Sequence, residues 1–345
     1  MEIDFTQLYG KKILITGGLG FIGSNLAQRL VTEGAEVEIY DGCLAPYGWN
    51  EANIKEITSR VIVTKADVRD YRTLCDRVQN KDIIFHLAAQ VGREVSMSDP
   101  HLDTEINCNG TINLCQACAL LKNPVKIIYA GSRGQIGEPV YLPVDEKHPT
   151  EPTDVYGINK LAAEKYLLLY GKILKIPVVS LRLNNVYGPR CQMQHGYYGI
   201  LNWFIQNCMT GKSITVYGDG QQTRDYVYVD DVADAFVRAA LSPNTDQKIY
   251  FIGSGKETVF LDMVKMVIRA VGQGEYIHVP FPPERENIDI RKFVVTFEKF
   301  QRATQWVPLT NLEDGIAKTV AFYRTRLQDY LVTGQVPLHN LSEIY

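Results

Sequence analysis

The stretch ILITGGLGFIGSNLAQRL, residues 13–30, decides the fold of this chain. It runs from a continuous apolar segment through Gly17, Gly20 and Gly23 into an amphipathic pattern with the period of a helix. Glycines in this order let the backbone approach a pyrophosphate at a helix N-terminus, where free N–H groups and the helix dipole favour anions. The stretch therefore predicts a strand, a phosphate-binding loop and a helix.

Strand-like apolar runs alternate with helical patterns through the first half of the chain. The runs are KILITG, EVEIYD, RVIVTKAD, DIIFHLAA, VKIIYAGS and VVSLRLNNVYG. Continuous apolar strands between helices are typical of a parallel sheet that helices cover on both faces. The sequence therefore predicts an α/β fold with a Rossmann-type, doubly wound parallel sheet.

After about residue 186 the pattern changes and becomes richer in Gly, Tyr and Gln. We expect a smaller, mixed C-terminal substrate-binding domain there. The predicted cofactor-binding domain covers residues 1–185 and about 226–252, the second domain covers 186–225 and 253–330, and 331–345 form a tail. No low-complexity linker separates the lobes, so they are expected to form one body.

Composition narrows the class of protein. The chain of 345 residues has a formal net charge of -3, which gives no general electrostatic reason to bind nucleic acid or a membrane. The acidic N-terminus does not resemble a secretory signal, and no stretch approaches the roughly 18 apolar residues of a membrane span. Seven cysteines without metal-ligand spacing favour a reducing cytoplasm and no metal site.

Asp41 ends the run EVEIYD, 18 residues beyond Gly23. A carboxylate at this place accepts hydrogen bonds from both ribose hydroxyls of NAD and repels the 2′-phosphate of NADP. We therefore expect NAD to be bound by the loop and this acid, that is, by Gly17, Gly20, Phe21, Ile22, Gly23 and Asp41. The alternative is an ordinary strand-to-helix turn with a capping aspartate.

Tyr156 and Lys160 lie four residues apart in DVYGINKLAAEKY, so both face the same side of a predicted helix. A free tyrosine has a pKa of about 10, and an adjacent ammonium together with a bound, positively charged nicotinamide would lower it. Tyr156 is then a candidate general base, Lys160 its electrostatic partner and a ribose ligand, and Ser132 a hydrogen-bond partner of the reacting oxygen. The alternative is a helix with an exposed Tyr/Lys pair.

Further motifs have the same order as in a known family. They are TGGLGFIG, the pair Asp67 and Val68, HLAAQ, SMSDP, NCNGTINL, YGINK, LRLNNVYGPR and VYGDGQQTRDYVYVDDVADA. Over residues 12 to about 310 the chain resembles the extended short-chain dehydrogenase/reductases, in particular the NAD-dependent nucleotide-sugar epimerases and dehydratases. The resemblance implies a nucleotide-diphosphate sugar as the substrate, NAD as the cofactor, and a homodimer formed by segments near 103–121 and 154–174.

The resemblance also implies roles for residues of this chain. Asp67 and Val68 would lie against the adenine, with further cofactor contacts from Leu87, Ala88, Ala89 and Asn107. Asn185 would contact the sugar or its diphosphate, and Tyr217 the nucleotide base. Arg224 and Arg285 would clamp the diphosphate, a task that suits a permanently charged guanidinium. Arg224 could instead be a surface arginine paired with Asp225, and the segment RENID around Arg285 departs from the family pattern.

The segment AGSRGQIGE, residues 130–138, bears on the reaction. Family members that dehydrate carry Asp-Glu directly after the Ser or Thr, whereas this chain has Arg133 and Gly134, and arginine stays charged at neutral pH. We therefore expect 4-epimerisation through a transient 4-keto sugar with NAD retained.

Four alternatives stay open. Residues 191–204 resemble a branch that epimerises C2 of deoxysugar nucleotides. Arg133 could bind the carboxylate of a uronic-acid substrate that is epimerised or decarboxylated. The protein could also be a net sugar-nucleotide oxidoreductase, or a sensor that binds dinucleotide without chemistry.

Overall fold

The computed structural model describes residues 3–44, 48–281 and 290–331. A seven-stranded sheet lies at its centre in the order β11-β6-β5-β4-β1-β2-β3, and every neighbouring pair is parallel. The strands are β1 (Lys12–Thr16), β2 (Glu36–Asp41), β3 (Val61–Lys65), β4 (Ile83–His86), β5 (Lys126–Ser132), β6 (Val178–Leu183) and β11 (Lys248–Ile252). The predicted Rossmann-type sheet is confirmed.

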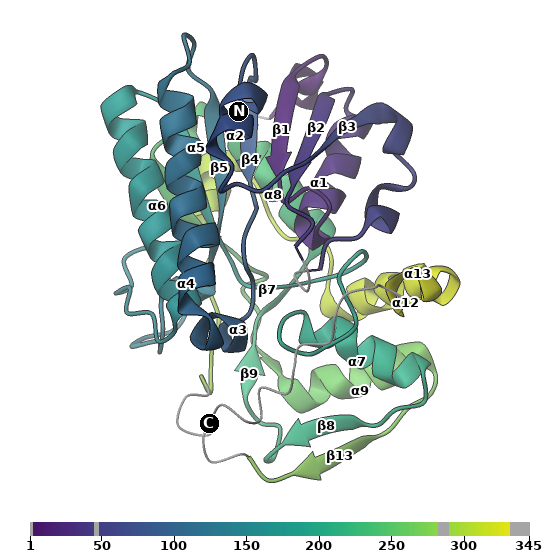
Figure 1. Ribbon diagram of the computed structural model, residues 1–345. Helices are drawn as coiled ribbons and strands as arrows, with labels where there is room; N and C mark the ends of the chain where they lie inside the picture. The colour runs from purple at the N-terminus through teal and green to yellow at the C-terminus, as the bar shows by residue number, and fades with distance from the viewer. Residues whose placement is uncertain (1–2, 45–47, 282–289, 332–345) are drawn as a thin grey trace.

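Helices cover both faces of this sheet (Figure 1). One face is covered by α1 (Phe21–Thr32) and α8 (Val229–Leu241), and the other by α2 (Tyr71–Arg77), α5 (Gly110–Ala119) and α6 (Val155–Leu174). The chain builds β1, β2 and β3 outward and then crosses back to place β4 on the other side of β1. Ligands of such sheets bind at this switch point, beyond the carboxyl ends of the strands.

Short helices lie around these ends and in the connections. They are η1 (Phe5–Leu8), η2 (Glu51–Ile54), η3 (Thr58–Arg60), α3 (Arg93–Ser98), α4 (Pro100–Asp103), the π-helix η4 (Thr104–Asn109), η5 (Arg133–Gln135) and η6 (Pro243–Thr245). The helices α4, η4 and α5 follow one another without a break. The sequence patterns did not predict the π-helix between them.

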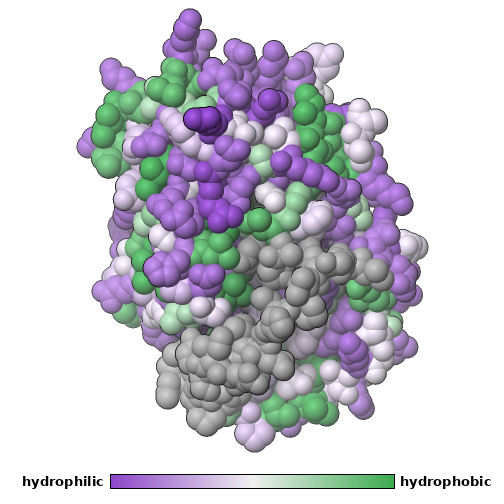
Figure 2. Space-filling model, viewed as in Figure 1, coloured by the Kyte–Doolittle hydropathy of each residue, from purple (hydrophilic) through white to green (hydrophobic). Residues whose placement is uncertain are grey.

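An apolar stripe lies on the surface of α6. Its members follow one another after eight, three and four residues and so lie on one side of the helix; they are Ile158, Tyr166, Leu169 and Ile173. Figure 2 shows hydrophobic side chains among hydrophilic ones on the side of the molecule where α5 and α6 lie. Within the described residues, no helix combines the length and the apolarity that a membrane crossing requires.

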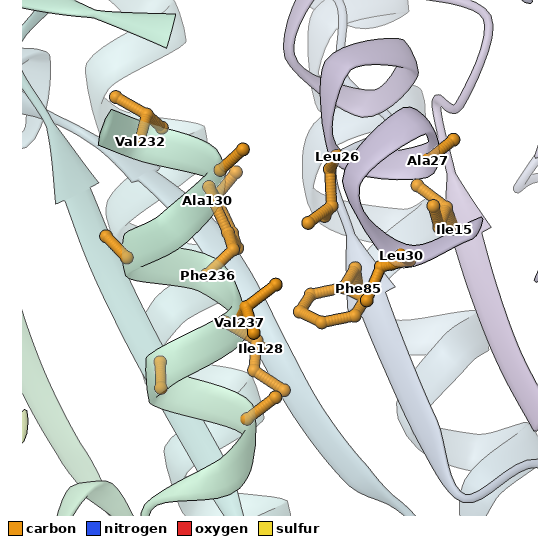
Figure 3. Packing of buried hydrophobic residues seen from close by; sticks show 14 of the residues in the cluster. Ile15, Leu26, Ala27, Leu30, Phe85, Ile128, Ala130, Val232, Phe236 and Val237 are labelled. Carbon is orange, nitrogen blue, oxygen red and sulfur yellow. The ribbon is translucent and has the colours of Figure 1, made fainter. Parts of the chain in front are cut away.

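The core between the sheet and its first helical layer is formed by aliphatic and aromatic side chains of β1, β4, β5, α1 and α8 (Figure 3). Phe85 of β4 meets Phe236 of α8 edge to face, with ring centroids 6.1 Å apart. Leu26 and Leu30 of α1 are fully buried beside them. Because parallel strands are covered on both faces, all four residues of β4 are buried, which explains the continuous apolar run in the sequence.

A smaller mixed lobe lies below the carboxyl ends of the sheet in the view of Figure 1. Its helices are α7 (Ile200–Met209), α9 (Phe260–Val271), α12 (Leu312–Arg326) and α13 (Gln328–Leu331). Its strands form three pairs, which are β7 (Asn185–Tyr187) with β10 (Tyr226–Tyr228), β8 (Ile214–Tyr217) with β13 (Tyr276–Val279), and β9 (Thr223–Arg224) with β12 (Thr258–Val259). This lobe has a core of its own around Phe204, Met263 and Tyr323.

One segment packs differently from the predicted division of the chain. Residues 293–306, which include α11 (Glu298–Thr304), were expected in the second domain. Phe300 and Trp306 instead complete the core beneath α8, and the Trp306 indole donates a hydrogen bond to the Asp231 carbonyl at 2.9 Å. This segment therefore covers the sheet domain. The strand β10, at the start of the predicted range of about 226–252, instead packs in the core of the second lobe through Tyr226 and Tyr228. The remaining boundaries stay predictions.

Candidate active site

A cavity of about 650 Å³ lies at the carboxyl ends of the central strands and extends to the second lobe. Its size is typical of a small-molecule site. Most of the predicted site residues line it, namely Gly17, Gly20, Phe21, Ile22, Gly23, Asp41, Asp67, Val68, Leu87, Ala88, Ala89, Ser132, Arg133, Tyr156, Lys160, Asn185 and Arg224. The fold thus brings together residues that are more than 200 positions apart in the sequence.

The loop between β1 and α1 has room for backbone and for little else. Gly17 has a φ of +73°, and a Cβ there would lie 2.8 Å from the Ala88 backbone nitrogen. A Cβ on Gly23 would collide with the Gly17 carbonyl oxygen. Gly20 caps α1 without a side-chain hydrogen bond, so the first N–H groups of the helix have no side-chain acceptor at the cap. This cradle suits an anionic pyrophosphate.

Two carboxylates line the cavity beyond the ends of β2 and β3. The Asp41 oxygens accept hydrogen bonds from the backbone nitrogens of Leu19 and Cys43, each at 2.9 Å, which fixes the direction of the carboxylate. Burial raises the pKa of Asp41, and these hydrogen bonds oppose the rise. Burial also acts to raise the pKa of Asp67, but hydrogen bonds and charge from Arg69 hold it below its usual value. A fixed acid at Asp41 fits the ribose of a dinucleotide.

A series of buried hydrogen bonds through His86 joins the carboxyl ends of β1 and β4 to α5. Thr111 donates to the Asn107 carbonyl at 2.8 Å, so its oxygen accepts from His86 Nε2 at 2.9 Å. His86 Nδ1 is then an acceptor for the Thr16 hydroxyl at 2.8 Å, and Thr16 accepts from the Ala88 nitrogen at 3.1 Å. Burial lowers the pKa of His86 to about 3, so the ring is neutral. The donors and acceptors along this series of hydrogen bonds therefore all follow one order.

Ser132 ends β5 and is held in place from two sides. Its hydroxyl oxygen accepts from the Gly134 nitrogen at 3.1 Å, and its own nitrogen donates to Gln135 Oε1 at 2.7 Å. A Cβ on Gly134 would lie 3.4 Å from Ser132 Oγ and 3.7 Å from Tyr156 Cδ1. Position 134 therefore faces both candidate catalytic groups and carries no side chain.

Tyr156 and Lys160 are both buried in α6, and burial shifts both pKa values. Burial raises the pKa of Tyr156 to about 12, although a hydrogen bond with Ser132 lowers it. Burial lowers the pKa of Lys160 to about 7, and its ammonium lies 4.3 Å from the centre of the Tyr129 ring. The pKa of Tyr156 is therefore raised and not lowered as expected, because desolvation of the phenolate outweighs the hydrogen bond with Ser132 and the charge of Arg133.

The first turn of α6 is fixed by three contacts. Asp154 caps the helix by accepting from the Gly157 nitrogen at 2.7 Å, and its other oxygen pairs with Arg93 Nε at 3.3 Å. The Tyr156 nitrogen donates to Ser96 Oγ at 3.1 Å. These contacts tie α6 to α3 and set the direction of the Tyr156 side chain.

Two arginines line the part of the cavity nearest the second lobe. Arg133 donates from Nε to Asn185 Oδ1 at 3.3 Å, and its guanidinium lies 5.2 Å from the centre of the Phe293 ring. Arg224 donates to the Thr223 carbonyl at 2.8 Å. Both bring positive charge to the space where a diphosphate is expected.

Two predicted residues, Asn107 and Tyr217, do not line the cavity, and the position of a third is not described. Asn107 is buried in η4, where its amide donates to the Gln90 carbonyl at 3.0 Å, so it supports the site from behind. Tyr217 ends β8 and packs on Phe281, with ring centroids 5.7 Å apart. Arg285 lies outside the described residues.

The motifs did not single out several residues of the cavity wall, namely Trp49, Arg93, Tyr197, Tyr198, Tyr226 and Phe260. The wall near Tyr198 is built by long-range contacts. A Cβ on Gly48 would lie 3.0 Å from the Tyr198 hydroxyl, and one on Gly92 would lie 3.7 Å from its ring. Gln192 holds the segment by donating to the Tyr198 carbonyl at 2.9 Å. The aromatic composition of residues 191–204 was the available signal.

Comparison with known proteins adds independent support. A model described as the NAD dependent epimerase/dehydratase family matches residues 13–253. A UDP-glucose 4-epimerase from Mycolicibacterium smegmatis is 34% identical over 319 residues, which span 92% of this chain and 100% of the relative.

Two solved structures have the same fold over almost their whole length. The Thermus thermophilus UDP-glucose 4-epimerase complex with NAD is 32% identical, with a TM-score of 0.81 over 91% of this chain and 99% of that one. The Thermotoga maritima UDP-glucose 4-epimerase with UDP-glucose is 29% identical, with a TM-score of 0.83 over 92% and 99%.

These matches confirm the resemblance inferred from the motifs and the expectation of NAD as the cofactor. The glycine cradle and the fixed carboxylate of Asp41 fit that cofactor. The chain belongs to the NAD-dependent epimerase/dehydratase family.

Proposed function

We propose that this protein is a sugar-nucleotide 4-epimerase that acts on a UDP-sugar and keeps NAD bound through the catalytic cycle. The observation that carries the proposal is the site around Ser132 and Tyr156. Position 134 faces both groups, at 3.4 Å and 3.7 Å from a Cβ placed there, and is a glycine. A dehydration would need an acid and a base beside the sugar, and the two residues after Ser132 supply neither.

The cofactor would occupy the part of the cavity between the glycine loop and Tyr156. The first N–H groups of α1 would hold the pyrophosphate, Asp41 the adenosine ribose, and Lys160 the ribose next to the nicotinamide. NAD, when bound, supplies the acceptor and later the donor of the hydride, and the positive charge of its nicotinamide favours a phenolate. We further propose that the sheet lobe holds the cofactor and the second lobe the sugar nucleotide.

Tyr156 would take the proton of the sugar C4 hydroxyl, which leaves a 4-keto sugar as hydride departs from C4. Ser132 would donate a hydrogen bond to the same oxygen. After the 4-keto sugar has rotated in the site, Tyr156 would return the proton to the C4 oxygen as the hydride adds to the opposite face of the sugar. No proton or electron is gained or lost overall, so a single acid/base residue suffices.

Arg133, Asn185 and Arg224 would bind the sugar nucleotide. They line the cavity from the β5 end to the second lobe, and two of them are cations. Planar guanidinium groups match the geometry of a diphosphate. We keep Tyr217 and Arg285 as candidates for the base and the diphosphate, respectively.

We also propose a homodimer and a cytoplasmic location. The apolar stripe on α6 supports the first, since Ile158 and Leu169 are each 52% exposed and Ile173 is 67% exposed. Packing the stripe against the same helix of a second copy would bury these side chains, as a two-fold interface requires.

Seven cysteines that remain unpaired in the described part of the chain support the proposed cytoplasmic location.

The test is turnover by the purified protein without added cofactor. UDP-glucose, UDP-N-acetylglucosamine and a panel of dTDP-, GDP- and CDP-sugars, with uronic acids included, would be incubated and read by proton NMR. We expect inversion at C4 of a UDP-sugar with no change of free cofactor absorbance at 340 nm.

Other outcomes would redirect the assignment. A 6-deoxy product would contradict the reading of Arg133 and Gly134. Inversion at C2, loss of CO₂, or one equivalent of NADH released per sugar would each replace the 4-epimerase by one of the alternatives. Absence of turnover with the whole panel would leave the dinucleotide sensor.

A further inference from the structure

Asp103 is a fully buried carboxylate behind the candidate catalytic residues. It ends α4, directly before the π-helix η4, and has no exposed surface. It does not line the cavity, so it contacts neither of the expected ligands. An ionisable side chain in such a place is costly unless charges or hydrogen bonds compensate it.

Only part of this compensation comes from hydrogen bonds. Asp103 Oδ1 accepts from Asn159 Nδ2 at 2.8 Å, and Asn159 directly precedes Lys160 on α6. Oδ2 is buried and has no hydrogen-bond partner among the described residues. Burial raises the pKa of Asp103, and the neutral amides of Asn159 and Asn107 oppose the rise. A nearby positive charge would stabilise the carboxylate further.

Lys160 can supply that positive charge, and its own buried ammonium needs a nearby negative charge. It is 2% exposed, and its ammonium lies 4.3 Å from the centre of the neutral Tyr129 ring. Two carboxylates, Asp103 and then Glu164, raise its pKa against the larger lowering by burial. In return, the Lys160 charge lowers the pKa of Asp103, which burial raises.

The second carboxylate, Glu164, is already committed to another cation. Its oxygens accept from Arg182 Nε at 3.0 Å and from Arg182 Nη2 at 2.6 Å, and Ser180 donates to it at 2.7 Å. The full charge of Arg182 therefore offsets that of Glu164. Within residues 3–44, 48–281 and 290–331, no ion pair joins Asp103 to a cation, so its charge is available to balance that of Lys160.

The other titratable groups that face this pair do not replace it. Asp154 raises the pKa of Asp103 by repulsion and is itself paired with Arg93. The neighbouring phenols of Tyr129 and Tyr156 are neutral, because burial raises both pKa values. The His86 ring on β4 is also neutral.

We infer that Asp103 is a positioning residue whose buried carboxylate is the counter-ion that keeps Lys160 a cation beside Tyr156. The inference rests on the proposed function, which gives Lys160 its electrostatic role toward the phenol. Without the counter-ion, Lys160 would lose its proton within the working pH range, and a neutral amine would no longer stabilise a phenolate. The Asp103 charge also raises the pKa of Tyr156 directly, so its effect through Lys160 is separated by following the titration of Lys160 itself.

The direct test is a titration of Lys160 by carbon-13 NMR of the lysine Cε atoms in the NAD-loaded full chain. The signal that disappears in Lys160→Met assigns the residue. In Asp103→Asn the amide oxygen can still accept from Asn159, but the charge is gone, so we expect the midpoint of Lys160 to fall by about one pH unit or more. Glu105→Gln, the same change at an exposed position two residues away, should leave it unchanged.

A further variant separates charge from packing. Asn159→Ala removes the 2.8 Å hydrogen bond and leaves the carboxylate, so the Lys160 midpoint should stay or rise. An equal fall in Asn159→Ala, or no fall in Asp103→Asn, would overturn the inference. Should Asp103→Asn not fold, Asp103→Ser carries the same expectation.

The pH profile of kcat provides the functional readout. Activity needs a charged Lys160, so the alkaline limb of Asp103→Asn should move to lower pH by the shift that NMR measures. A shifted Lys160 titration in a protein that epimerises no sugar nucleotide would overturn the proposed function and leave this inference standing. An active epimerase in which Asp103→Asn changes neither the alkaline limb nor the Lys160 titration would overturn this inference and leave the proposed function standing.

Discussion

The phenol of Tyr156 has to lose its proton during the proposed reaction, although its buried environment disfavours the phenolate. Burial raises its pKa to about 12, and the hydrogen bond with Ser132 only partly offsets this. Lys160 is itself desolvated, with a pKa of about 7. The pair is therefore poised for a cationic ligand, which would stabilise the phenolate in a site of low dielectric constant.

Tyr156→Phe keeps the ring and removes the acid/base group. We expect kcat for C4 inversion to fall by about 10²- to 10⁴-fold, the range for loss of a positioned proton-transfer residue, with NAD content and fold unchanged. Tyr166→Phe, on the exposed side of the same helix, is the matched control and should retain full activity. Equal activity of both variants would remove Tyr156 from the mechanism.

Asp41→Asn tests the choice between NAD and NADP. The amide keeps the shape of the side chain but removes the charge that attracts ribose hydroxyls and repels a 2′-phosphate. We expect NAD affinity to fall by about 10-fold, the effect of about 1.4 kcal/mol, while NADP affinity rises, as measured by calorimetry on the stripped protein. Glu36→Gln, at the exposed start of the same strand, should alter neither affinity.

At the scale of single elements, the start of α6 has both a structural and a catalytic task. Asp154 caps the helix two residues before Tyr156, and the same carboxylate pairs with Arg93 of α3. The cap thus fixes where the helix begins and how its first turn meets α3. Loss of the cap should therefore affect stability and turnover together.

Asp154→Ala and Asn311→Ala form a matched pair of cap deletions. Asn311 caps α12 by accepting from the Asp314 nitrogen at 2.9 Å, far along the chain from the catalytic segment. Each deletion should lower the free energy of unfolding by about 1 kcal/mol, within the usual range for caps. Only Asp154→Ala should also lower kcat, and an equal loss of activity in Asn311→Ala would contradict this assignment.

The elements differ in how far the sequence could predict them. The strands and the glycine loop were predictable, because buried parallel strands are continuously apolar and the loop chemistry is local. The π-helix η4 was not, since an extra residue in a helical turn leaves no periodic signal. The packing of residues 293–306 was not predictable either, because Phe300 and Trp306 are buried by α8, which lies far away in the sequence.

At the scale of the whole molecule, the cavity joins segments that only the fold brings together. Tyr198 approaches Gly48 and Gly92, and Arg133 meets Asn185 and Phe293. The motifs identified most residues of the wall one by one but gave no distances between them. Tyr217 shows the limit, because its motif gave no indication that its ring packs on Phe281.

The stripe on α6 leads to a prediction about assembly. Ile173→Arg places a charge on a side chain that is 67% exposed in the single chain. If two copies pack through this helix, the charge would be buried there, and sedimentation velocity should show monomers. Ile277→Arg, on β13 with 48% exposure, is the control and should leave the dimer intact. Dimers in both variants would exclude this surface.

The π-helix η4 also sets the rotational phase of everything that follows it. Asp103 before it faces α6, whereas Thr111 after it reaches the β4 histidine and Leu114 enters the core. Losing the one extra residue between 104 and 109 would close this turn as ordinary α-helix and keep α5 in phase. Losing a second residue would turn α5 by about 100°, the step of one residue in an α-helix. The buried face of α5 would then rotate toward solvent, and Thr111 would leave His86. Natural length variation in this turn should therefore be limited to the one extra residue, even where neighbouring loops of relatives differ more in length.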